Sequence, residues 1–133
     1  MSGVRRALTL LPARFAICRF APGTPLPAWL FHEDTRVWSL TRTPNELSVV
    51  CDEDDLPPAV TPAPGRWRAL QVAGPIPFEE VGVVAGITAP LAAAGVPVFV
   101  ISTHDTDLVL VPDRKLDAAC EALKGFVIER GSE

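Results

Sequence analysis

The 133-residue sequence has no excess of positive charge. It contains 12 Lys and Arg residues against 16 Asp and Glu residues, which gives a formal net charge of −4, and the basic residues are spread along the chain. Proteins that bind nucleic acid usually concentrate basic residues on one surface, and no aromatic-rich RNA-reading motif is present. We therefore expect no nucleic-acid partner.

Cysteine is scarce, and its spacing does not suggest pairing. Cys18, Cys51 and Cys120 lie far apart inside apolar runs, without a C-x-x-C motif. This pattern predicts small core residues in a reducing, cytoplasmic environment. The basic start of the chain is not expected to be a signal peptide, because Pro12 and Arg14 shorten its apolar region. We interpret it as the lead-in to a strand.

Motifs for catalysis and metal binding are also missing. The two histidines, His32 and His104, are far apart, and neither a G-x-S-x-G elbow nor an H-E-x-x-H helix occurs. Ser102, His104 and Asp105 cannot form a catalytic triad, because nearly adjacent residues at a strand end point to opposite faces. The acidic run 52–55 lacks the glycine turn of a calcium loop. We expect no catalysis, no metal and no cofactor.

Charged residues are absent from positions 81 to 103, a stretch long enough to span a membrane as a helix. Its composition argues against that structure, because Gly95 and Pro97 should stop a helix midway. We expect a soluble helix followed by a buried strand, and no membrane partner.

A proline-rich segment, residues 56–65, divides the sequence into two predicted domains, 1–62 and 63–133. Before it, apolar runs predict strands at 8–20, 37–41 and 47–51. Pro44 and Asn45 suit a tight turn between the last two, which should form a hairpin.

After the proline-rich segment, the pattern becomes regular and predicts an α+β fold. The expected elements are a strand at 67–73, a helix at 79–94, strands at 96–101 and 107–111, a helix at 114–124 and a strand at 126–129. In this β-α-β-β-α-β order both helices cover one face of an antiparallel sheet. Asp113 can cap the second helix and Gly125 can end it in a left-handed conformation. Pro90 should bend the first helix or delay its start.

Two features of this half suggest a ligand site. The segment Gly82–Gly86 opens a helix, so backbone N–H groups and the positive end of the helix dipole are available to an anion. An equally good interpretation is that the glycines of this segment allow the helix to pack closely on the sheet. Asp107 begins the apolar strand 107–111, where a carboxylate needs a partner or water. If both features face one crevice, they match the carboxylate and the amine of a free α-amino acid.

Residues 88–99, T-A-P-L-A-A-A-G-V-P-V-F, and 101–111, I-S-T-H-D-T-D-L-V-L-V, resemble the ACT-domain family. The likeness is to a branch of small bacterial tandem-ACT proteins related to the eukaryotic cytosolic arginine sensors. Residues 38–41 and 50–54 resemble the first lobe of the same proteins. The resemblance implies two ACT-like lobes, a degenerate one at 1–62 and a ferredoxin-like (βαββαβ) ACT domain at 63–133. It also implies a homodimer with an amino-acid ligand at an ACT–ACT interface.

The resemblance assigns ligand contacts residue by residue. They are Glu80, Val81, Gly82 and Val83 at the helix start, Pro97 and Val98 at the second strand, and Thr103 and Asp107 in the hairpin. Pro97 has no backbone N–H, so one main-chain donor is absent here. The expected function is allosteric regulation of a partner protein through amino-acid binding, without catalysis. The alternative is a protein–protein interaction module that binds no ligand.

Overall fold

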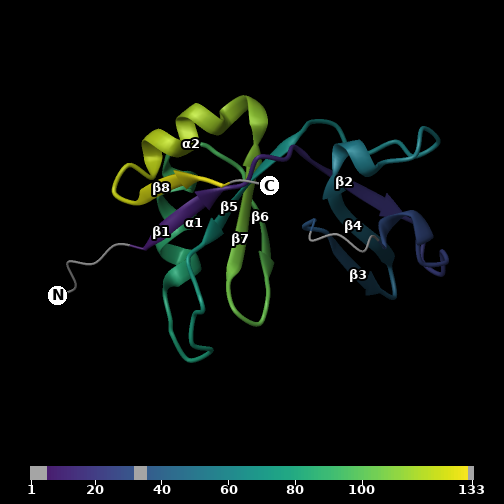
Figure 1. The fold of residues 1–133 in the computed structure, drawn as a ribbon, viewed down its shortest axis with the longest axis horizontal. Coiled ribbons are helices and arrows are strands. Elements are labelled where there is room, and N and C mark those ends of the chain that lie inside the picture. The colour runs from purple at the N-terminus through teal and green to yellow at the C-terminus, as the bar shows by residue number, and fades with distance from the viewer. Residues whose placement is uncertain (1–5, 32–35, 132–133) are drawn as a thin grey trace. The chain divides into compact units, whose positions relative to one another are not determined.

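The computed structural model describes residues 6–31 and 36–131 (Figure 1). The chain forms two compact units, of which the larger comprises Met1–Pro12 with Trp67–Glu133 and the smaller Ala13–Arg66. Among the described residues, no helix has the length and apolar character that crossing a membrane requires. The uncharged stretch instead contains an 11-residue helix followed by a strand, as the sequence predicted, but the strand is partly exposed rather than buried.

The larger unit contains a five-stranded sheet and two α-helices. Its elements are β1 (Ala7–Leu10), β5 (Trp67–Val72), α1 (Val83–Ala93), β6 (Phe99–Ser102), β7 (Asp107–Pro112), the 3-10 helix η3 (Asp113–Lys115), α2 (Leu116–Ala122) and β8 (Val127–Arg130). The strand order is β6-β7-β5-β1-β8. Only β1 and β8 pair in parallel; the other described neighbours in this sheet are antiparallel.

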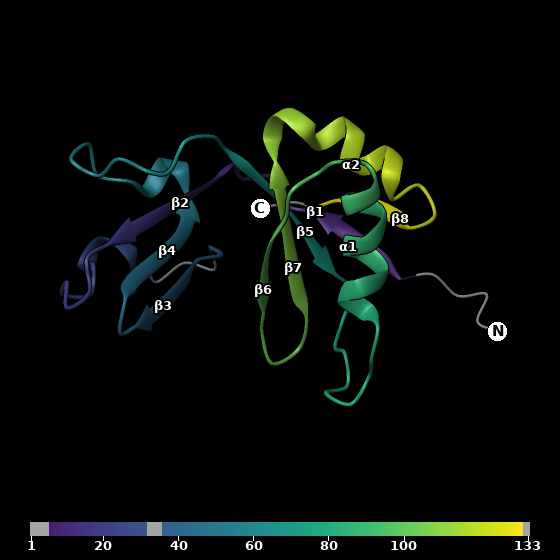
Figure 2. The ribbon, with the colours of Figure 1, turned by 180° about the vertical axis from the view of Figure 1, so that it is seen from behind.

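Both helices pack on the same face of this sheet (Figure 2). Ile87 and Leu91 of α1, Ala119 of α2 and Leu123 directly after α2 are fully buried. They share a core with side chains from β1, β5 and β7, namely Leu8, Leu10, Leu70, Val72, Val109 and Val111. Alternate residues of each strand face the helices, as the period of a strand requires. The ferredoxin-like α+β fold predicted from the sequence is confirmed.

The N-terminal strand was not expected in this sheet. β1 lies between β5 and β8, with Leu8 opposite both Val72 and Ile128. The predicted strand at 8–20 is therefore two strands, β1 and β2 (Phe15–Phe20), which belong to different units. Pro12 lies in the break between them, where it removes a ladder N–H. The predicted boundary at 62 and 63 falls inside the smaller unit, whereas residues 6–12 belong to the larger one.

The helix ends differ from their predictions in three places. α1 begins at Val83 rather than at 79, because Gly82 has a left-handed conformation (φ +83°) immediately before it. The N-cap residue of α2 is Lys115 rather than Asp113, whose carboxylate lies 3.5 Å from the guanidinium of Arg68. Gly125 has no positive φ, although Gly95 after α1 does, with φ +74°. Pro90, which was expected to bend the first helix or delay its start, lies inside α1.

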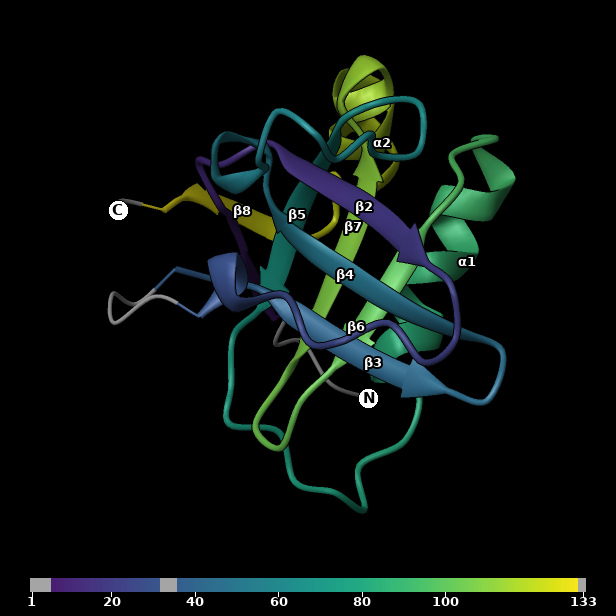
Figure 3. The ribbon, with the colours of Figure 1, turned by 90° about the vertical axis from the view of Figure 1, so that its right-hand side faces the viewer.

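The smaller unit is a three-stranded antiparallel sheet in the order β3-β4-β2 (Figure 3). Its further elements are β3 (Ser39–Thr43), β4 (Glu46–Asp52) and the 3-10 helices η1 (Ala28–Leu30) and η2 (Glu53–Asp55). The hairpin between β3 and β4 turns at Pro44 and Asn45, as predicted. Within residues 13–31 and 36–66 there is no α-helix, which agrees with a degenerate lobe.

Two cysteines lie in the core of the smaller unit. Cys18 and Cys51 are buried beside Ala16, Leu30 and Val49. Burial raises the pKa of the Cys18 thiol and raises that of Cys51 to about 12. Both remain protonated at neutral pH, so they act as small apolar residues rather than nucleophiles.

Candidate functional site

A cavity of about 400 Å³ lies in the larger unit, at the N-terminal end of α1. Its lining comes from the loop that precedes α1, from the first turn of α1, and from the hairpin that joins β6 to β7. These three segments contain both features from which the sequence predicted a ligand site. Its volume falls within the range of roughly 300–1,000 Å³ that small-molecule sites occupy.

The start of α1 supplies backbone donors to this cavity. The backbone of Gly82 is in a left-handed conformation that residues other than glycine rarely adopt, and the helix begins directly after it. The first intrahelical bond runs from Gly86 N to Gly82 O over 2.9 Å. The N–H groups of Val83, Val84 and Ala85 therefore have no acceptor within the helix, and the positive end of the helix dipole is located there.

The β6–β7 hairpin supplies the polar side chains. Thr103 N donates to Thr106 O over 2.8 Å, and Thr106 N donates to the Thr103 hydroxyl over 3.2 Å. Ser102 Oγ donates to Asp107 Oδ1 over 2.6 Å. These bonds satisfy backbone groups of the turn, beyond the end of the ladder. The Ser102 bond also fixes the half-buried Asp107 carboxylate where β7 begins.

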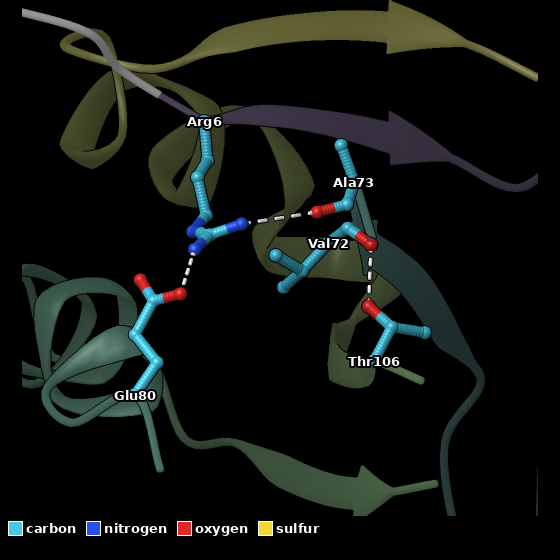
Figure 4. A network of polar contacts seen from close by, with 5 residues as sticks. All are labelled: Arg6, Val72, Ala73, Glu80 and Thr106. Atoms are coloured by element: carbon cyan, nitrogen blue, oxygen red, sulfur yellow. Dashed lines mark hydrogen bonds and ion pairs between the residues drawn. The ribbon is translucent and has the colours of Figure 1, made fainter. Parts of the chain in front are cut away.

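Hydrogen bonds tie the loop before α1 to this hairpin. Ile76 N donates to Asp105 O over 2.7 Å, and the Thr106 hydroxyl donates to Val72 O (Figure 4). The backbone at Gly74 approaches so closely that a Cβ there would lie 2.8 Å from Asp105 O. The two walls of the cavity are therefore held together by backbone contacts rather than by side-chain packing alone.

An ion pair anchors the other side of the same loop. The guanidinium of Arg6 pairs with the Glu80 carboxylate through Nη2 and donates from Nη1 to Ala73 O over 3.3 Å (Figure 4). Arg6 and Glu80 are 74 positions apart in the sequence. The insertion of β1 beside β5 brings them together, and the sequence carried no signal for this contact.

Two rings also line the cavity. Phe78 and His104 meet edge to face, with ring centroids 4.8 Å apart and an interplanar angle of 75°. His104 Nδ1 lies 2.7 Å from Asp105 Oδ1, whereas the Ser102 hydroxyl donates to Asp107. Ser102 and His104 thus have different carboxylate partners, in line with the exclusion of a triad. Across residues 6–31 and 36–131, no group of three His, Cys, Asp or Glu residues is placed to hold a metal ion.

The cavity brings together five of the eight residues assigned from the resemblance, namely Glu80, Gly82, Val83, Thr103 and Asp107. Val81, Pro97 and Val98 do not line it; the Val81 residue is 89% exposed, and the other two are exposed immediately before β6. The sequence reasoning did not assign Ile76, Phe78, Ser102 or Thr106 to the site, although all four line it. Ser102 and Thr106 belong to the run 101–111 that carries the resemblance, but nothing in the sequence distinguished Phe78.

Comparisons with known proteins agree with this architecture. An ACT-domain family model matches residues 63–125, and a second family model, described as an N-terminal domain, matches residues 13–59. A crystal structure of a protein from Agrobacterium tumefaciens is 32% identical, with a TM-score of 0.86 over 98% of this chain and 97% of its own. This chain belongs to the ACT-domain family. The resemblance found in the sequence is confirmed.

Two other proteins indicate how far the likeness extends. The human cytosolic arginine sensor for mTORC1 subunit 1 is 41% identical over 59 residues, which is 44% of this chain and 18% of the sensor. The matched segment therefore represents less than a fifth of that relative. The ligand-free regulatory subunit of aspartate kinase from Thermus thermophilus has a TM-score of 0.58 at 15% identity, over 85% of this chain and 92% of its own. This second likeness shows a shared fold.

Proposed function

We propose that this ACT protein binds a free amino acid in the cavity at the start of α1 and regulates a partner protein, with no catalysis of its own. One observation carries the proposal: the first-turn N–H groups of α1 and the Asp107 carboxylate line the same cavity. The family match and the likeness to proteins named as an arginine sensor and a kinase regulatory subunit support it.

The proposed pose assigns each end of the ligand to one wall. The α-carboxylate lies at the N–H groups of Val83 to Ala85, where the helix dipole favours negative charge. The α-ammonium group bonds to Asp107, which Ser102 holds in place through a 2.6 Å hydrogen bond. Thr103 shapes the turn through its bonds to Thr106. The ligand is thus recognised by the two groups that every free amino acid shares.

We also propose that two copies form a cytoplasmic homodimer in which the ligand lies at an ACT–ACT interface. Val81, Pro97 and Val98 are exposed outside the cavity of the single chain, and this proposal places them at the surface that faces the second copy. A ligand that binds better to one dimer arrangement shifts the population toward it, which gives a means of regulation. Sedimentation equilibrium with and without ligand tests the dimer.

Thermal unfolding of the purified protein against the twenty amino acids at millimolar concentration tests ligand binding. A ligand at 100 times its Kd adds about 2.7 kcal/mol to the stability of the folded state, which raises the midpoint by several degrees. Asp107→Asn should abolish this shift while the unliganded midpoint stays within about 2 °C of wild type. Asp117→Asn, an exposed carboxylate in α2, is the matched control and should keep the shift.

Other outcomes would contradict the proposal. If no amino acid shifts the midpoint of the wild-type protein, the chain is better explained as an interaction module without a ligand. If Asp107→Asn keeps the full shift, amino-acid binding stands but the assigned role of Asp107 is wrong.

A further inference from the structure

We infer that Arg6 makes this site selective for amino acids with a neutral, apolar side chain, because it neutralises the second carboxylate of the cavity. This inference rests on the proposed function and adds the ligand class. The observation behind it is the ion pair between Arg6 and Glu80, a residue that lines the cavity.

The charges of the described cavity lining are few. Its carboxylates are those of Glu80 and Asp107, and no Lys or Arg is among the described lining residues. His104 also lines the cavity, but its ring already lies against the exposed carboxylate of Asp105. The electrostatic recognition of a ligand therefore depends on two carboxylates and the helix start.

Arg6 removes one of these carboxylates from ligand recognition. Its guanidinium contacts Glu80 and also donates to Ala73 O, so the side chain is held at two points. Its backbone lies at the entry to β1, whose pairing with β5 and β8 fixes its distance from the loop. The guanidinium of the protein itself thus occupies the position at which a ligand cation would meet Glu80.

A zwitterion with a neutral side chain leaves no charge unmatched in this arrangement. Its carboxylate is matched by the helix start, its ammonium group by Asp107, and Glu80 by Arg6. A basic side chain brings a third charge whose natural partner is already paired, and an acidic side chain brings a second negative charge for which the described lining offers no Lys or Arg.

The remainder of the lining favours an apolar side chain. Ile76, Pro77, Phe78 and Val83 contribute apolar surface, and the Phe78 ring lies edge-on to His104. Transfer of apolar ligand surface from water to such a wall is favourable at roughly 25 cal/mol per Å². We therefore expect branched or aromatic side chains, such as those of leucine and phenylalanine, to bind best.

Isothermal titration calorimetry on the full chain with leucine, phenylalanine, arginine, lysine and glutamate tests the inference. Wild type should bind leucine or phenylalanine more tightly than arginine, lysine or glutamate. Arg6→Gln should lower the Kd for arginine and lysine about two- to five-fold, the size of an exposed ion pair's contribution, and leave that for leucine unchanged. The gain should vanish in the double variant Arg6→Gln/Glu80→Gln.

Two further variants control for folding and for general charge effects. Arg6→Lys keeps the positive charge and should behave as wild type. Arg114→Gln removes a charge of the same sign from η3 and should change no Kd.

Two outcomes separate this inference from the proposed function. Wild-type binding of arginine or lysine as tight as that of leucine, or an unchanged arginine Kd in Arg6→Gln, would overturn the role of Arg6 while amino-acid binding stands. Absence of binding for every amino acid in wild type and in Arg6→Gln would overturn both.

Discussion

The larger and the smaller unit both contain antiparallel strand pairs, but different structures lie at the ends of those strands. In the larger unit, the β6–β7 hairpin and the start of α1 leave polar groups around a shared cavity. The described part of the smaller unit has no α-helix, and its sheet packs on a core that contains Cys18 and Cys51. The proposed ligand site therefore depends on a helix start beside a strand turn, rather than on the sheet itself.

The largest expected difference between the units concerns their cores. Leu91→Ala in α1 and Leu30→Ala in η1 both remove a fully buried side chain, so each should lower the free energy of unfolding by about 2–5 kcal/mol. Only Leu91→Ala should also weaken amino-acid binding, because Leu91 supports the helix whose start lines the cavity. Urea unfolding and ligand titration of both variants measure the two effects. Equal loss of ligand affinity in folded Leu30→Ala would contradict this separation.

The next prediction compares two glycines of the helix start. Gly82→Ala forces a Cβ into a left-handed conformation and should destabilise the protein by about 1–2 kcal/mol, with weaker ligand binding. Gly86→Ala, inside α1 with no atom within 4 Å of the added Cβ, should stabilise it by about 0.5–1 kcal/mol. Thermal unfolding of the pair measures the contrast. Equal effects would show that the left-handed turn is not what fixes the start of α1.

The smallest effect is expected in the smaller unit at alkaline pH. Burial raises the pKa of the Cys51 thiol from 9.0 to about 12, so the folded state keeps the proton that the unfolded state loses. This contribution to stability is fully present below pH 9 and is lost as pH rises from about 9 toward about 12. Urea unfolding between pH 7 and pH 10 should show this decline, and Cys51→Ala should reduce its slope. An identical slope would contradict the assignment to Cys51.

Local sequence patterns determined how much of the fold could be predicted. The strand and helix periods of residues 67–130 gave the order β5-α1-β6-β7-α2-β8, and the turn at Pro44 gave the β3–β4 hairpin. The position of β1 could not be predicted, because its partners Val72 and Ile128 are separated from it by long stretches of chain. The expected caps of the second helix were also wrong: Asp113 lies 3.5 Å from Arg68, a residue distant in sequence, and Gly125 has no positive φ.

In the candidate site, too, some residues could be predicted from local sequence and others could not. Gly82 and Asp107 were identifiable because each is unusual in its local context, a glycine before a helix and a carboxylate at the start of an apolar strand. Arg6 and Phe78 were not, since the role of Arg6 depends on the inserted strand and that of Phe78 on the path of a loop. Charge pairing across 74 positions has no signature in a single sequence.

An amide NMR titration with leucine, or with whichever amino acid stabilises the protein most, tests the central claim most directly. We expect chemical-shift changes at the amides of Val83, Val84, Ala85 and Asp107, with smaller ones along the β6–β7 hairpin. Amides in the core of the smaller unit, such as Cys18 and Val49, should not move beyond the effect of added salt. Absence of shifts at the start of α1, or shifts confined to the smaller unit, would contradict the assignment of the ligand site.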